Sequence, residues 1–208
     1  MVSNWGITQG EGAKVLPKIN STRRQLIVVD DFLENPDEMR ELALQQKYKP
    51  RHSAGVRSEE TFPFFEIYRD CFAELLDEDI SFREFCEPVG ESVNGCFQWC
   101  KPPQHKVIHC DAQRWAGALY LTPDAPVEAG TTLYRHKETK ERYDTSPGLF
   151  SGGYYDETRW EVVDNIGNIY NRLVLWHGTT VHAASVYFGQ EIHDSRLFQV
   201  FFFNGRPR

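Results

Sequence analysis

The second half of the chain is a series of short runs of strand-forming residues separated by turn residues. The runs are Cys96–Lys101, Gly117–Thr122, Thr131–Tyr134, Arg172–Trp176, Val181–Phe188 and Leu197–Phe203. Turn residues such as Pro102-Pro103, Gly178 and Gly189 separate some of them. Several short strands without long helices between them predict an antiparallel sandwich or barrel.

The first half predicts helices that support this β region. After a short apolar strand at Leu26–Val29, Asn35 can cap a helix that has Pro36 at its first position and ends near Gln46. Apolar residues at helical spacing predict a second helix over Phe64–Leu76. A further short helix is expected within Ile80–Val93.

The polar segment Lys47–Pro63 lies between these helices. It carries the basic residues Arg51 and Arg57 and is rich in turn-forming residues. The sequence is compatible with a solvated loop or with part of the rim where a substrate enters. Composition leaves both interpretations open.

Length and charge restrict the classes of function. The chain has 208 residues, which predicts a single domain over residues 1–208, with helical support at about 26–93 and the β core at about 95–204. Its net charge of −7 disfavours general nucleic-acid binding, because an acidic surface repels phosphates. No apolar stretch is long enough to span a membrane. The sequence does not fix the oligomeric state, and a homodimer is compatible with it.

The five cysteines predict a reducing environment. Their number is odd, no C-x-x-C pair occurs, and a chain of this size needs no disulfide staples. Buried thiols on a strand are the simplest interpretation of Cys96 and Cys100. A cytoplasmic location is therefore expected.

His109-Cys110-Asp111 carries the clearest chemical signal. In extended backbone, residues two apart point to the same side, so an H-x-D triplet presents an imidazole and a carboxylate together. A second imidazole from a distant strand would complete a facial set of two His and one carboxylate, which suits Fe(II) because it leaves positions open for ligands. Of His177, His182 and His193, the sequence favours His182, because it begins a predicted strand.

Arg196 begins the last predicted strand and can reach the same cavity. A guanidinium binds a carboxylate through two parallel hydrogen bonds, so Arg196 is the candidate for holding the far carboxylate of a bidentate keto acid. Tyr120 could donate its hydroxyl to the same carboxylate, and Gln98 is a weaker candidate of the same kind.

Residues His136–Gly167 interrupt the predicted strands. The segment is polar, and Trp160, Val163, Ile166 and Tyr170 recur near helical spacing. Such a long insertion is uncommon without a function. A lid over about 136–167 and a helix packed outside the sheet are both compatible with the pattern.

Together these motifs resemble the Fe(II)/2-oxoglutarate-dependent dioxygenases, in the prolyl-4-hydroxylase-like division. The resemblance covers residues 26–204 and rests on Val28–Leu33, His109 with Asp111, Tyr120-Leu121, His182 and Arg196. Gly130–Tyr134 matches a further motif loosely. Two features depart from the division: Arg196 stands where prolyl hydroxylases usually have Lys, and the His136–Gly167 segment has no counterpart.

The resemblance implies a double-stranded β-helix, or jelly-roll, core backed by helices, and thus a mainly β member of the α+β class. Fe(II) would bind His109, Asp111 and His182, and 2-oxoglutarate would bind Arg196. With O2 these yield succinate and CO2. Relatives that halogenate lack this carboxylate, so Asp111 makes hydroxylation the default outcome, with demethylation or desaturation as alternatives.

The expected substrate is a small amino-acid-like metabolite or a peptide side chain. Cationic residues that could meet its carboxylate are Arg114, Arg135 and His136, with Arg51 and Arg57 as further candidates. A jelly-roll protein that binds or senses a metal without turnover is the alternative function, since it needs the same triad but not Arg196. If the chain were a purely structural domain, the presence of His109, Asp111, His182 and Arg196 together would be a coincidence.

Overall fold

The computed structural model describes residues 25–51, 54–61, 65–86, 92–144, 149–150, 153 and 155–208. In these residues the strands form a seven-stranded sheet in the order β1-β9-β6-β11-β5-β3-β2, a three-stranded sheet in the order β10-β7-β8, and the pair β12-β4. The strands are β1 Leu26–Val29, β2 Tyr48–Pro50, β3 Val56–Thr61, β4 Glu78–Asp79, β5 Cys96–Cys100, β6 Trp115–Tyr120, β7 Thr131–His136, β8 Trp160–Ile166, β9 Leu173–His177, β10 His182–Ala184, β11 Arg196–Phe203 and β12 Arg206–Pro207.

The large sheet presents two different faces because successive strand residues alternate in direction. Along β11, Phe198 and Val200 face the small sheet, whereas Phe201 and Phe203 face the helices. The neighbouring strands β5, β6 and β9 alternate in the same way. One sheet therefore supports a helical layer on one side and a cavity on the other.

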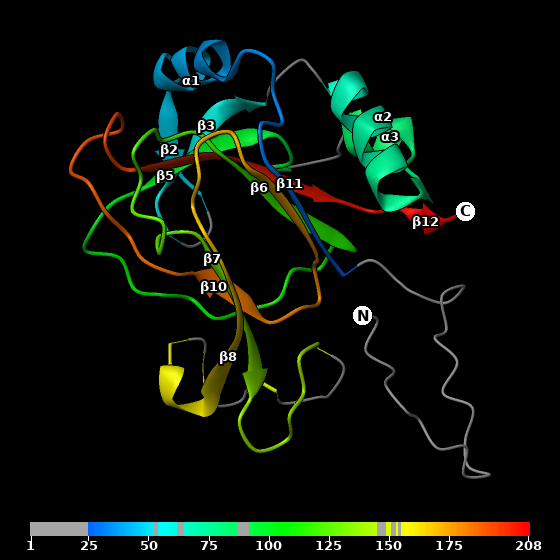
Figure 1. Ribbon diagram of the computed structural model, residues 1–208, viewed down its shortest axis with the longest axis vertical. Coiled ribbons are helices and arrows are strands. Elements are labelled where there is room, and N and C mark those ends of the chain that lie inside the picture. The colour runs from blue at the N-terminus through cyan, green and yellow to red at the C-terminus, as the bar shows by residue number, and fades with distance from the viewer. Residues whose placement is uncertain are drawn as a thin grey trace, which may run out of the picture.

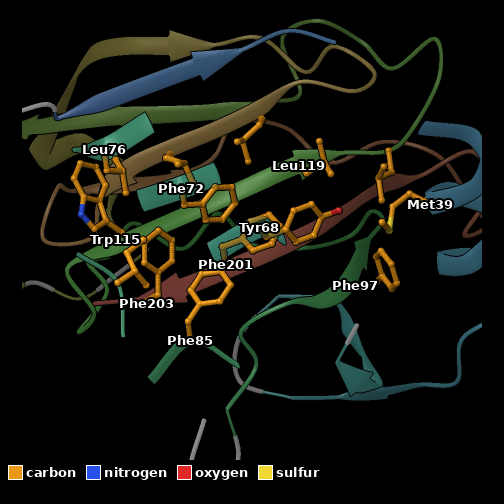
Figure 2. Close-up of a cluster of buried hydrophobic side chains, with 14 of the residues drawn as sticks. Met39, Tyr68, Phe72, Leu76, Phe85, Phe97, Trp115, Leu119, Phe201 and Phe203 are labelled. Atoms are coloured by element: carbon orange, nitrogen blue, oxygen red, sulfur yellow. The ribbon is translucent and has the colours of Figure 1, made fainter. Parts of the chain in front are cut away.

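Three helices cover the outer face of the large sheet: α1 Pro36–Leu44, α2 Phe65–Leu76 and α3 Phe82–Cys86 (Figure 1). The contact is largely aromatic. Figure 2 shows Phe72 of α2 among the rings of Tyr68, Phe85, Phe201 and Phe203. None of the helices in the described ranges is long and apolar enough to cross a membrane.

The predicted fold class is confirmed, and β1, α1, α2 and most later strands lie where the sequence places them. The helix α1 has Pro36 in its first turn, but the expected cap is wrong, because the Asn35 side chain makes no capping hydrogen bond. The predicted strand Val181–Phe188 is also too long. The strand that pairs with β7 covers only His182–Ala184.

Two segments differ from the sequence prediction. Lys47–Pro63 contains β2 and β3, which extend the large sheet beyond β5, so it is not simply a loop. The helical interpretation of Trp160–Tyr170 is wrong: β8 pairs with β7 over its whole length, and Trp160 and Ile166 are buried while Val162 is exposed. The part of the predicted lid at 145–148, 151–152 and 154 lies outside the described residues, as does the polar segment 1–24.

Candidate active site

His109, Asp111 and His182 come together at the edge of the small sheet. His109 forms an isolated bridge with His182, in which each backbone N–H donates to the other residue's carbonyl at 3.0 and 2.9 Å. Asp111 is fixed next to them by its N–H, which donates to the carbonyl of Gly178 at 2.8 Å. A potential ligand atom from each of the three side chains lies within 4.8 Å of the others.

Hydrogen bonds of the two imidazoles fix their tautomers. Nδ1 of His109 lies 2.9 Å from the carbonyl of Val107, and Nδ1 of His182 lies 2.8 Å from that of Thr180. A carbonyl can only accept, so both Nδ1 atoms carry a proton, and in the neutral ring each Nε2 then presents a lone pair. Metal-binding histidines are oriented by such bonds.

The three side chains consequently face one another as hydrogen-bond acceptors. Nε2 of His109 is 3.7 Å from Oδ1 of Asp111, and Nε2 of His182 is 3.2 Å from Oδ2. Oδ2 is buried and has no hydrogen-bond partner among the described residues. Acceptors held together without a donor repel one another, and a divalent cation between them removes that repulsion. The donor set fits Fe(II).

The local electrostatics favour the metal-binding protonation states. Burial, reinforced by the neighbouring His182, lowers the pKa of His109 to about 4, so this imidazole is neutral at pH 7. Burial alone would raise the pKa of Asp111, but the two histidines and Arg57 together hold it below its usual value. The triad therefore offers a neutral imidazole and a carboxylate without needing to lose protons.

A cavity between the two sheets begins at the histidines. Its volume is about 630 Å³, including the part that opens to solvent. Small side chains leave this space, namely Gly117 and Ala118 on the large sheet and Ala183 and Ala184 on the small one. Polar residues that line it include Arg57, Gln98, His109, Thr131, His182 and Arg196.

Arg196 is a buried cation in this cavity, with 3% of its surface exposed. Its Nε and Nη2 donate to the carbonyls of Ala129 and Gly130 at 3.1 and 3.2 Å, and its guanidinium lies 4.1 Å from the centre of the Phe198 ring. No carboxylate of the described ranges lies within ion-pair distance of it. Backbone carbonyls orient this guanidinium but do not neutralise its charge.

Tyr120 and Gln98 lie close to this cavity in different ways. The Tyr120 hydroxyl bonds Oγ1 of Thr131 at 2.8 Å, and the Arg196 guanidinium lies 5.5 Å from the Tyr120 ring, so Tyr120 packs behind Arg196. Burial raises the pKa of Tyr120, which keeps its hydroxyl protonated. Gln98 lines the cavity and accepts a hydrogen bond from Nε of Arg57 at 2.7 Å.

The three predicted substrate residues do not line the cavity. Arg114 pairs with Glu78 on the helical side of the sheet at 2.7 Å, and Arg135 is exposed and pairs with Glu161 at 2.7 Å. His136 is buried against Trp160 on the small sheet. Of the cationic residues that the sequence offered for meeting the substrate, Arg57 does line the cavity. Trp176 also lines it, and its indole nitrogen has no partner in the described part of the chain.

A family model described as a family of unknown function, DUF6445, matches residues 14–149. The chain belongs to the DUF6445 family. No curated protein matches it significantly.

Solved structures identify the fold. The crystal structure of HygX from Streptomyces hygroscopicus, with nickel, 2-oxoglutarate and hygromycin B bound, is similar at a TM-score of 0.60 and 9% identity, over 88% of this chain and 84% of that one. A Pseudomonas putida prolyl-4-hydroxylase has a TM-score of 0.42 at 12% identity, over 86% and 92% of the two chains. The likeness to HygX shows that this DUF6445 chain has the jelly-roll fold of the 2-oxoglutarate oxygenases.

Proposed function

We propose that the chain is an Fe(II)- and 2-oxoglutarate-dependent dioxygenase. The observation that carries the proposal is one cavity lined by the two histidines of the triad and by Arg196, a buried cation without a carboxylate partner among the described residues. The first feature calls for a metal ion and the second for an organic anion. A protein that only binds a metal has no need of the second.

Different residues would bind the metal and the cosubstrate. His109, Asp111 and His182 would hold Fe(II), and Arg196 would bind the 5-carboxylate of 2-oxoglutarate through its guanidinium fork. Bound Fe(II) and 2-oxoglutarate would supply the reaction with O2 that forms succinate and CO2 and transfers one oxygen atom to the substrate. Thr131 lies between the two sheets, where its hydroxyl orients Tyr120 behind the guanidinium.

Hydroxylation of an unactivated C–H bond is the outcome that we propose. Asp111 supplies the third ligand, so no position is vacated for a halide. The cavity between the sheets restricts the reacting group to a small molecule or a side chain.

Anaerobic absorption spectroscopy tests this function. Metal-free protein is titrated with Fe(II) and then with 2-oxoglutarate, and a weak visible charge-transfer band, shown by neither component alone, is expected. Arg196→Gln should weaken 2-oxoglutarate binding about thirtyfold or more, because it removes a buried charge-assisted contact. Arg135→Gln, which changes an exposed arginine, is the matched control and should titrate like the parent. Iron binding without the band would favour a metal-binding protein without turnover.

A further inference from the structure

Arg57 is a second buried cation in the same cavity. It lies on β3, has 8% of its surface exposed and lines the cavity. Its Nε donates to Oε1 of Gln98, and its guanidinium lies 5.7 Å from the centre of the Phe202 ring. The described residues place no carboxylate within ion-pair distance. Burial lowers the pKa of Arg57, yet a guanidinium remains charged at neutral pH.

Gln98 holds this guanidinium in a fixed orientation. The Gln98 amide donates through Nε2 to the carbonyl of Ala54 at 2.8 Å, which directs its Oε1 at Arg57. Gln98 is neutral and engages only Nε, so it positions the side chain without satisfying its charge. A buried charge left in this state is costly and is typical of a site that receives an anion.

The two cavity arginines serve different ends of the cavity. Arg57 is close enough to the triad for its charge to lower the pKa values of both Asp111 and His109. Arg196 contacts Ala129, Gly130 and the Phe198 ring. Phe198 and Phe202 are four residues apart on β11, so their backbones lie roughly 13 Å apart along the strand. The two guanidiniums therefore contact rings at different positions along β11.

Trp176 marks the same end of the cavity as Arg57. Register pairs Trp176 with Ala116 and Ala116 with Phe202, so Trp176 and Phe202 lie two strands apart on one face. The Trp176 ring also contacts His182 at 4.9 Å between centroids, and its buried indole N–H has no described acceptor. The metal end of the cavity thus holds a cation and a free donor.

We propose that Arg57 binds the carboxylate of the primary substrate, which makes that substrate a small monocarboxylic acid of net charge −1. The inference rests on the proposed function. With Fe(II), Asp111, dianionic 2-oxoglutarate and the two arginines in place, the cavity retains one positive charge, and a monoanion neutralises it. An internal residue of a peptide brings no such charge.

Arginine side-chain NMR of the full-length protein tests this assignment. Labelled protein is loaded with Zn(II), which is diamagnetic, and with saturating 2-oxoglutarate, and the Nε–H signals are followed while propionate is added. Arg57→Gln and Arg196→Gln assign the two signals by their disappearance. Propionate should shift the Arg57 signal in a saturable way, whereas uncharged propionamide of the same shape should not.

The variants separate this proposal from the function on which it rests. Binding of propionate to the Zn(II)- and 2-oxoglutarate-loaded protein is also measured by calorimetry: Arg57→Gln should abolish it and leave 2-oxoglutarate affinity within about twofold, while Arg57→Lys, which keeps the charge, should restore part of the propionate binding. An Arg57 signal that does not respond to propionate overturns the proposal. So does a tenfold loss of 2-oxoglutarate affinity in Arg57→Gln, which would make Arg57 a cosubstrate residue. Failure of 2-oxoglutarate to bind the parent protein would instead contradict the proposed function.

Discussion

At the scale of single residues, the triad lowers the free energy of unfolding of the metal-free protein. Backbone carbonyls orient the two imidazoles so that the neutral rings turn acceptor nitrogens toward the Asp111 carboxylate. Burying a polar atom without a partner costs about 1–3 kcal/mol, and Oδ2 of Asp111 is such an atom. Removing one of the facing acceptors should therefore raise the stability of the metal-free protein, and this change can be measured.

Replacing that carboxylate by an amide should stabilise the metal-free protein. Asp111→Asn supplies an N–H that can donate to Nε2 of His182, so at pH 8 we expect the free energy of unfolding to rise by about 1 kcal/mol. For a chain of this length the Tm should increase by about 2–4 °C. Calorimetry in a chelating buffer measures the change.

The same variant should bind Fe(II) much more weakly, because a neutral amide is a poor ligand for the ion. Asp144→Asn, which changes a carboxylate outside the triad, is the comparison variant and should leave iron binding unchanged. A lower Tm for metal-free Asp111→Asn would show that Asp111 already has a protonated partner and that the acceptor argument is incorrect.

At the scale of elements, β1 is attached to the edge of the large sheet by an ion pair as well as by its ladder. Asp30 follows β1, and its two carboxylate oxygens accept from Nε and Nη2 of Arg172, just before β9. Arg172 holds the pKa of Asp30 below its usual value. A carboxylate with a depressed pKa stabilises the folded state above its unfolded pKa, and that contribution disappears as the pH falls through the folded value.

Asp30→Asn should therefore lower stability at neutral pH only. We expect a loss of about 0.5 kcal/mol at pH 6, as is typical of an exposed ion pair, and convergence with the parent once the pH is low enough to protonate the folded Asp30, below the usual pKa of an aspartate. Urea unfolding at several pH values measures the difference. In an Arg172→Gln background Asp30→Asn should have little further effect, and an unchanged pH-dependent difference there would assign it to another partner.

The sequence predicted the elements whose patterns are local and missed those that depend on pairing partners. His109 and Asp111 could be identified because their spacing alone places them on one side of extended backbone. Arg57 could be named only as one of several candidate cations, because its place in the cavity depends on β3 pairing with β5, which sets Arg57 opposite Gln98 across some forty residues of chain. Likewise, Trp160–Ile166 has apolar residues at helical spacing, yet pairing with β7 overrides that local pattern.

At the scale of the whole molecule, the helical layer and the cavity share the same strands. Phe201 packs against Phe72, while the adjacent Val200 and Phe202 line the cavity. The close packing of α2 against the sheet therefore fixes the positions of strands that carry Gln98 and Arg196 on their other face. The helices stabilise the site without contributing a side chain to the triad.

Phe72→Ala tests this dependence, because Phe72 is fully buried and its ring lies within 6.1 Å of five other aromatic rings, measured between centroids. The free energy of unfolding should fall by about 3–5 kcal/mol. Val162→Ala, at an exposed position of β8, should cost less than about 0.5 kcal/mol. Urea unfolding is followed by circular dichroism and, in parallel, by Fe(II) binding. If one layer supports the other, both signals should disappear at the same urea concentration in the parent and in Phe72→Ala; loss of iron binding well before loss of secondary structure would show that the site is held by the small sheet alone.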